Sequence, residues 1–254
     1  ALVLLAAALK NFGSSARRSG WNARLAGVLL ASTASLAAAG PSNASVAPFS
    51  DDFSRAQRKL TGYVMDNGKI RTARDAWLAD KTAAEATYGH ISTWETSGVT
   101  DMSWLFCVRQ DWMEGDSTYI YCVSAASFNE DIGAWDTSGV TRMYGMFWGA
   151  SSFNQNIGSW SVGNVNEMGH MFTSASAFDQ DISAWSVDNV RDMHQMFSSA
   201  SSFDQDISAW SVENVRDMNH MFNSASSFNQ DIGGWSVEQV TDMHYMFHYA
   251  SSFS

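Results

Sequence analysis

The chain has 254 residues, 45% hydrophobic side chains and a formal net charge of −11, and the charge is divided unevenly. Residues 1–93 carry a net charge of +5 and residues 94–254 a net charge of −16. The acidic C-terminal part repels a phosphate backbone, which argues against nucleic-acid binding. The apolar content is sufficient for a packed core.

Residues 1–39 have the composition of a signal or anchor-like leader. Three arginines precede the apolar run 25–39, which ends in three alanines before Gly40. This order is typical of a cleaved secretory signal, and the run is shorter than the roughly 20 residues of a membrane-spanning helix. Because residues 1–9 form a second apolar stretch and the chain begins with Ala, an uncleaved membrane anchor and an organelle leader stay open. We expect membrane contact through this leader alone.

Residues 40–52 contain both prolines and many small side chains, which predicts a linker. Asn43 begins the tripeptide Asn-Ala-Ser, an acceptor for N-glycosylation. Such a site is consistent with an exposed secreted segment.

Residues 53–93 are predicted to form a helical N-terminal cap. Apolar residues recur there at intervals of three and four, the period of one helix face, and Asp66-Asn67-Gly68 divides the stretch in two. An array of repeats needs a cap with an apolar inner face and a polar outer face. We expect the basic residues to form the outer face, although a basic helix can also lie on an anionic membrane. These are Arg55, Arg58, Lys59, Lys69, Arg71, Arg74 and Lys81.

Residues 94–254 are built from a repeat of 25 residues, W-S-V-x-N-V-x-D-M-x-x-M-F-x-x-A-S-S-F-x-Q-D-I-x-x. Such a period is the signature of a solenoid, in which each coil buries its apolar face against the next. About six coils are predicted, and the last is incomplete. The tryptophans that set the period are Trp135, Trp160, Trp185, Trp210 and Trp235.

Each coil is predicted to hold one short helix and one short strand. In V-x-x-M-x-x-M-F-x-x-A the apolar residues follow one helix face. An Asn commonly precedes this stretch with an acid three residues on, as in Asn189 and Asp192, which is typical of a helix N-cap. The segment Q-D-I-x-x-W-S-V would add one strand per coil to a narrow parallel sheet.

The first coil, beginning at Trp94, carries a 16-residue insertion bracketed by the two cysteines of the chain, Cys107 and Cys122. Cysteines at the two ends of a loop that the repeat does not need suggest a disulfide, which contributes roughly 3 kcal/mol in the chain-entropy view. Two free buried cysteines are the alternative. The inserted loop, 107–122, is also the one part of the array not dictated by the repeat, so either it binds a ligand or it covers the first coil.

The repeat resembles that of the BspA-like surface proteins, a divergent relative of leucine-rich repeats. The segments M-F-W-G-A-S-S-F-N-Q-N-I-G and A-S-S-F-N-Q-D-I-G-G-W-S-V carry this resemblance over 94–254, and D-A-W-L-A-D at residue 75 resembles the segment that opens such arrays. The resemblance implies an α/β, leucine-rich-repeat-like solenoid. It also implies a secreted or surface-displayed binding protein, and it supplies no catalytic residues.

A column of acidic and amide residues runs through the coils, with Asp131, Asp181, Asp206 and Asp231 among its members. A carboxylate stack could bind Ca²⁺, which prefers six to eight oxygen ligands. The mixture of Asn and Asp fits side chains that cap backbone turns better. We therefore expect no metal and no cofactor.

Four histidines, His170, His194, His220 and His244, occupy two adjacent positions in successive coils. A zinc site would need tighter spacing on one element, so surface histidines are predicted.

Some aromatic residues fall outside the shared core pattern. Together with the aromatic residues of the inserted loop they suggest a surface for a protein or carbohydrate ligand. The candidate binding residues are Trp112, Tyr119, Tyr121, Trp104 and Trp148, and Tyr144, Tyr245 and Tyr249 also lie outside the core pattern.

The sequence therefore predicts a non-enzymatic, secreted or surface-displayed protein that binds a protein or glycan. A structural spacer or assembly scaffold without a ligand is the alternative. Because Ser254 lies inside a coil, we expect either further repeats or a C-terminal cap, or end-to-end self-association through the open coil.

Overall fold

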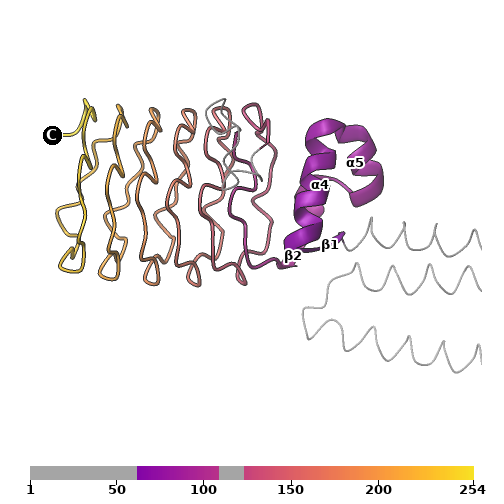
Figure 1. Cartoon of the computed structure of the whole chain (residues 1–254), viewed down its shortest axis with the longest axis horizontal. Coiled ribbons are helices and arrows are strands. Elements are labelled where there is room, and N and C mark those ends of the chain that lie inside the picture. Colours follow the sequence, from indigo (N-terminus) through magenta and orange to yellow (C-terminus); the bar gives the residue numbers. More distant parts are fainter. Residues whose placement is uncertain (1–61, 109–122) are drawn as a thin grey trace, which may run out of the picture. The chain divides into compact units, whose positions relative to one another are not determined.

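The computed structural model describes residues 62–108 and 123–254, which lie in one compact unit (Figure 1). Within these residues, no helix has both the length and the apolar character needed to cross a bilayer. Several predicted features fall outside the described residues: the leader 1–39, the linker 40–52 with Asn43, the first part of the cap, and Trp112, Tyr119, Tyr121 and Cys122 of the inserted loop.

Helices in the described part of the chain lie at its N-terminal side, and a stack of coils follows them (Figure 1). Strands β1 and β2 pair in parallel, so that the segment leading into the helices lies beside the segment leading out. In chain order the elements are β1 (Val64–Asp66), α4 (Asn67–Ala79), α5 (Lys81–Tyr88), the 3-10 helix η1 (Ile91–Thr93) and β2 (Glu95–Gly98).

Two aspartates set the boundaries of the helices. The Oδ1 of Asp66 accepts hydrogen bonds from the N–H groups of Gly68 and Lys69, at 3.0 and 2.8 Å, and so caps α4. Asp80 ends α4 and starts α5, because its N–H donates to Ala76 while its Oδ1 accepts from the N–H of Ala83. The break expected at Asp66-Asn67-Gly68 is therefore the start of a helix.

Each coil consists of turns whose N–H groups are used alternately within the coil and between coils. The N–H of Met146 closes a turn on the carbonyl of Met143, whereas the N–H of Gly145 donates to Gly169 in the next coil, at 2.9 Å. In-register parallel bridges link the coils along one column: Asp101–Arg142, Arg142–Glu167, Glu167–Asp192, Asp192–Asp217 and Asp217–Asp242. The coils are thus joined by backbone hydrogen bonds at steps of one repeat.

The helix predicted for each coil is not formed in the described coils, and the assignment to a leucine-rich-repeat-like α/β class stays a prediction. Left-handed backbone at two positions of nearly every coil interrupts any helix. Instead of capping a helix, the amide of Asn189 donates to the carbonyl of Gly163 in the preceding coil, at 2.7 Å. The left-handed positions are Trp104, Gly145, His170, Gln195, His220 and Tyr245, and Gly149, Ser174, Ser199, Ser224 and Tyr249.

The core is a set of aromatic stacks that run along the array, as the repeat predicts. Phe172 and Phe197 are fully buried and stack across adjacent coils with ring centroids 5.6 Å apart. The indole rings of Trp185 and Trp210 stack with centroids 6.4 Å apart, and the indole N–H of Trp210 donates to the carbonyl of Ile182. Each such ring pair contributes about 0.5–1.5 kcal/mol beyond its buried area.

Helix α4 of the cap both joins this core and donates hydrogen bonds to the first coil. Ile70, Ala73 and Trp77 of α4 are buried in the continuous core cluster. The prediction that Arg74 lies on the polar outer face of the cap is wrong, because its side chain is buried against the first coil. Arg71 likewise donates from Nη1 to the carbonyl of Ser103, at 2.9 Å.

Candidate binding surface

In the first coils, aromatic side chains stand at positions near the left-handed turns whose residue type varies from coil to coil. Trp148 occupies the position of Thr173 and Ser198 in later coils, and Tyr144 that of Gly169. Because these positions do not contribute to the repeated core, the repeat itself does not require rings there.

These rings gather into one cluster, hereafter the aromatic cluster, made of Trp104, Tyr144, Trp148, His170 and His194. The centroid of Trp104 lies 5.5 Å from that of Trp148 and 5.0 Å from that of Tyr144. Trp148 in turn stacks on His170 at 4.8 Å, and His170 lies edge-on to His194. The two predicted residues Trp104 and Trp148 are thus brought together from adjacent coils.

Gly145 makes room for the aromatic cluster. Its φ of 58° is in the left-handed region, which favours glycine. A Cβ at this position would lie 2.4 Å from two ring carbons of Trp104. The Trp104 ring therefore lies directly against the backbone of the next coil.

The inserted loop leaves and re-enters the array beside the aromatic cluster. Val108, near the start of the insertion, and Val123, directly after its end, form a parallel bridge, and the N–H of Val123 donates to the carbonyl of Cys107 at 2.9 Å. Cys107 is disulfide-bonded and packs with Trp104 and Trp148 in a small buried cluster. Its predicted partner lies outside the described residues, as do the aromatic residues of the loop.

The predicted aromatic residues of the last coil do not join the aromatic cluster. Tyr245 and Tyr249 are 52% and 74% exposed and contact the histidines of their own coil and the one before. Two aromatic regions therefore lie at different levels of the array.

The prediction of surface histidines is wrong for His170, which is buried, while His194 is half-buried. Burial, aided by the nearby charge of His194, lowers the pKa of His170 to about 4. Burial also disfavours the charged form of His194, but the hydrogen bond and charge of Asp192, with a contribution from Asp217, outweigh it and raise the pKa of that imidazole. His170 and His194 lie 24 residues apart, one less than the repeat, and this spacing is the sequence signal that could have predicted the contact of their rings.

The side chains proposed as a calcium column cap turns of their own coils. The Oδ1 of Asp131 accepts from the N–H of Gly133, and that of Asp181 from the N–H of Ser183, at 3.0 and 2.9 Å. In later coils the N–H of Ser208 donates in the same way to Oδ1 of Asp206, and the N–H of Gly233 to Oδ1 of Asp231. This is the turn-capping role that Asn and Asp commonly perform.

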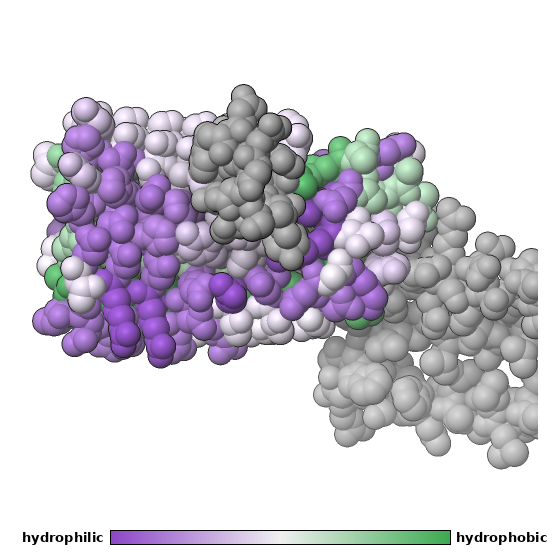
Figure 2. Space-filling view, in the orientation of Figure 1, coloured by the Kyte–Doolittle hydropathy of each residue, from purple (hydrophilic) through white to green (hydrophobic). Residues whose placement is uncertain are grey.

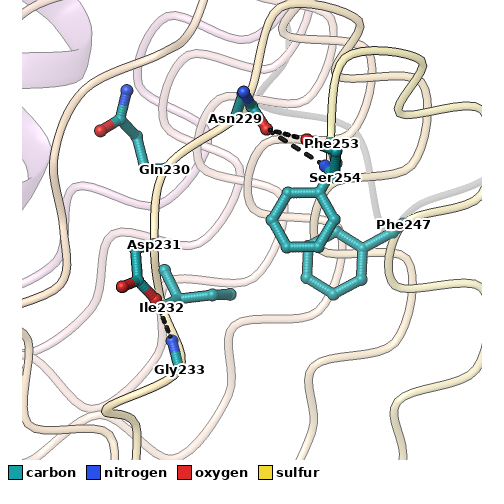
Figure 3. Close-up of a pocket in the computed structure, with 8 residues that line it drawn as sticks. All are labelled: Asn229, Gln230, Asp231, Ile232, Gly233, Phe247, Phe253 and Ser254. Atoms are coloured by element: carbon teal, nitrogen blue, oxygen red, sulfur yellow. Dashed lines mark hydrogen bonds between the residues drawn. The ribbon is translucent and has the colours of Figure 1, made fainter.

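The outer face of the later coils is predominantly hydrophilic, in keeping with the acidic composition of the array (Figure 2). An open cavity of about 440 Å³ lies at the last coil, where the rings of Phe247 and Phe253 face Ile232 (Figure 3). Its Asn229 Oδ1 accepts from the N–H of Ser254, at 3.1 Å. The cavity lies on the face of the coil that carries the stacked core rings, and we assign it no ligand.

Stacked turns, an aromatic core and side-chain ladders between coils define a repeat protein with one irregular, aromatic region. The family described as "Mycoplasma protein of unknown function, DUF285" matches residues 80–206 and again residues 181–254. The chain belongs to this family. Searches of curated proteins and of solved structures found no match.

Proposed function

We propose that this chain is a secreted or surface-displayed, non-enzymatic protein of the BspA-like kind that binds a protein or glycan partner through the aromatic cluster and the adjoining inserted loop. The observation that carries the proposal is the convergence of three rings at non-core positions of the first coils: Trp104, Tyr144 and Trp148 gather where the insertion leaves and re-enters the array. Trp104 and Tyr144 are half-buried and keep part of their rings accessible, whereas Trp148 is 8% exposed and packs against Trp104. Rigid aromatic side chains provide large contact area at a low entropic cost.

Two further observations support this proposal. The disulfide bond of Cys107 is expected in an oxidising compartment, which agrees with secretion or surface display. The family match covers the region that resembles the BspA-like repeat. An enzyme is disfavoured because the polar side chains of the repeat are largely used in hydrogen bonds to adjacent turns and coils, as Asp181 and Asn189 illustrate.

A structural spacer is the alternative function. The regular stacking of Phe and Trp rings suits a rod whose length is set by the number of repeats. A spacer should tolerate changes in the aromatic cluster and should be altered by removal of one complete 25-residue unit, such as 186–210.

The array supplies its own matched variants for the test. Trp148→Ser and Trp104→Gln install the residues that Ser198 and Gln195 provide at the same positions of a later coil. Tyr249→Ser, which copies Ser224, is the control at the last coil. The labelled protein would be applied to a printed glycan array and to a panel of purified extracellular-matrix proteins.

We expect the wild-type protein and Tyr249→Ser to bind the same probe, and Trp148→Ser and Trp104→Gln to lose at least tenfold in affinity. A cooperative thermal unfolding transition would show that each variant is folded, although the loss of the buried Trp148 ring should lower the midpoint of Trp148→Ser. Equal binding by all four proteins would reject the aromatic cluster as the binding surface and favour the spacer.

A further inference from the structure

Three possible metal ligands, one of them His194 of the aromatic cluster, converge at the edge of that cluster. The side chains of Asp192, His194 and Asp217 each offer one ligand atom, and these atoms lie within 4.8 Å of one another. The two carboxylates are stacked by the parallel bridge between adjacent coils. All three side chains are half-buried, so the ligands are held by the fold and remain within reach of solvent.

The imidazole of His194 is oriented from both sides. Its Nε2 lies 3.1 Å from the hydroxyl of Tyr144, and its Nδ1 lies 2.6 Å from Oδ1 of Asp192. A ligating histidine commonly bonds through one ring nitrogen while the other donates a hydrogen bond that fixes the ring. Tyr144 provides that second contact, which leaves Nδ1 directed at the carboxylates.

We propose that Asp192, His194 and Asp217 form a binding site for a divalent transition-metal ion, with Zn²⁺ as the representative ion. One imidazole nitrogen and two carboxylate oxygens form a mixed N/O ligand set that suits such ions, and two carboxylates balance the charge of the ion. Ca²⁺ is a poorer fit, because it prefers six to eight oxygen ligands. Water would complete the coordination, and the proton shared by Nδ1 and Asp192 would be released to solvent on binding.

The next coil shows the same carboxylate stack without the histidine. Asn219 occupies the position of His194, and its N–H donates to Oδ1 of Asp217 at 2.9 Å, as the N–H of His194 donates to Asp192 at 3.0 Å. The Asn219 amide lies 3.4 Å from Oδ2 of Asp217 and 3.5 Å from Oδ2 of Asp242. The amide thus bridges two stacked carboxylates where, one coil earlier, the imidazole and a metal ion would do so.

This comparison makes His194→Asn the decisive variant, because it copies a residue that the array already accommodates at that position. Asp217→Asn removes one carboxylate and keeps an oxygen that accepts the N–H of Asn219. Asp242→Asn and His244→Asn are controls one coil or more away from the proposed ligands. Zn²⁺ would be titrated calorimetrically into metal-stripped full-length protein, with Ca²⁺ as a separate titrant.

We expect one Zn²⁺ site in the wild-type protein and in both controls. His194→Asn and Asp217→Asn should each weaken that site at least tenfold, and Zn²⁺ should raise the thermal midpoint of the wild-type protein but not of His194→Asn. Substitution with Co²⁺ should give visible absorption bands that His194→Asn abolishes. If Asp217→Asn fails to fold, His194→Asn alone decides.

Three outcomes would overturn the proposal. Undiminished Zn²⁺ binding by His194→Asn would mean that an adventitious ion binds elsewhere. Loss of the site in His244→Asn would place it at the last coil. Ca²⁺ binding as tight as that of Zn²⁺ would show that the carboxylates alone bind cations without selectivity.

Discussion

The Nη1 of Arg74 donates to the carbonyl oxygen of Leu105 across 2.6 Å, in the place that a backbone N–H takes in the next coil. There, the N–H of Phe106 donates to the carbonyl of Met146, which is the counterpart of Leu105. Arg71 makes the same substitution at Ser103. The cap therefore closes the array by replacing backbone donors of a preceding coil with guanidinium groups.

Arg74→Met should lower the stability of the array. It retains the buried stem of the side chain but removes the donor to Leu105, and an unsatisfied buried carbonyl costs about 1–3 kcal/mol. Urea unfolding followed by tryptophan fluorescence would measure the loss. Lys69→Met, which removes a solvent-exposed ion pair with Asp66, should leave the midpoint unchanged. Equal midpoints for Arg74→Met and wild type would contradict the capping role.

A ladder of side chains between coils should also contribute to stability. The Oδ1 of Asn154 accepts from the N–H of Asp179 and from Nε2 of Gln180 in the next coil, at 3.0 and 2.8 Å. Asn154→Ala should therefore cost about 1–2 kcal/mol in urea unfolding.

Asn154→Asp is the matched control for the ladder. Asp179 makes the same two contacts with Asp204 and Gln205 one coil later, so a carboxylate can replace the amide oxygen at this position. The control should lie close to wild type. If it is as unstable as Asn154→Ala, the hydrogen bonds are not the cause.

The composition of the core could be predicted from the sequence, whereas the local backbone could not. Apolar residues at intervals of three and four are buried as expected, among them Met143, Met146, Phe147 and Ala150. A series of turns closed between residues three apart produces the same spacing as a helix, so periodicity did not distinguish them. The left-handed residues, such as Gln195 and Ser199, distinguish these turns from a helix, but their residue types do not reveal a left-handed backbone.

Two residues of the candidate surface could be predicted from the sequence, and others could not. Trp104 and Trp148 are conspicuous because they break a repeat, and the structure brings them together. The contact of His194 with Tyr144 spans two coils and 50 residues, and no spacing within one coil predicts it. Arg74 was placed on the wrong face because the helix period alone does not show that carbonyl groups lie beneath it.

His170 should make stability depend on pH. Its pKa is about 4 in the folded protein and about 6.5 when unfolded, so the unfolded chain binds the extra proton between those values. The free energy of unfolding therefore falls as the pH is lowered from 6.5 to 4, by about 2–3 kcal/mol in total. His194, whose pKa is raised, acts in the opposite direction, since its contribution is present at low pH and lost as the pH rises through its folded pKa.

His170→Gln isolates this effect, because Gln195 holds the same left-handed position in the next coil. The difference in unfolding free energy between the wild-type protein and this variant should change between pH 6.5 and 4, while contributions from groups that do not interact with His170 cancel. Parallel curves over that range would show that His170 titrates normally. Measurements at each pH by urea unfolding would decide.

Gly145→Ala should disturb the aromatic cluster and destabilise the first coils. The new methyl group would lie 2.4 Å from ring carbons of Trp104, and the residue would hold a φ of 58° that disfavours L side chains by roughly 1–2 kcal/mol. We expect a lower thermal midpoint together with a red-shifted tryptophan emission, because the Trp104 ring must move outward. Gly163→Ala is the control, since its Cβ would meet its nearest atom, the Ser186 hydroxyl, only at 3.8 Å. A similar loss in both variants would mean that the effect arises from the backbone of any repeat glycine and not from the packing of Trp104.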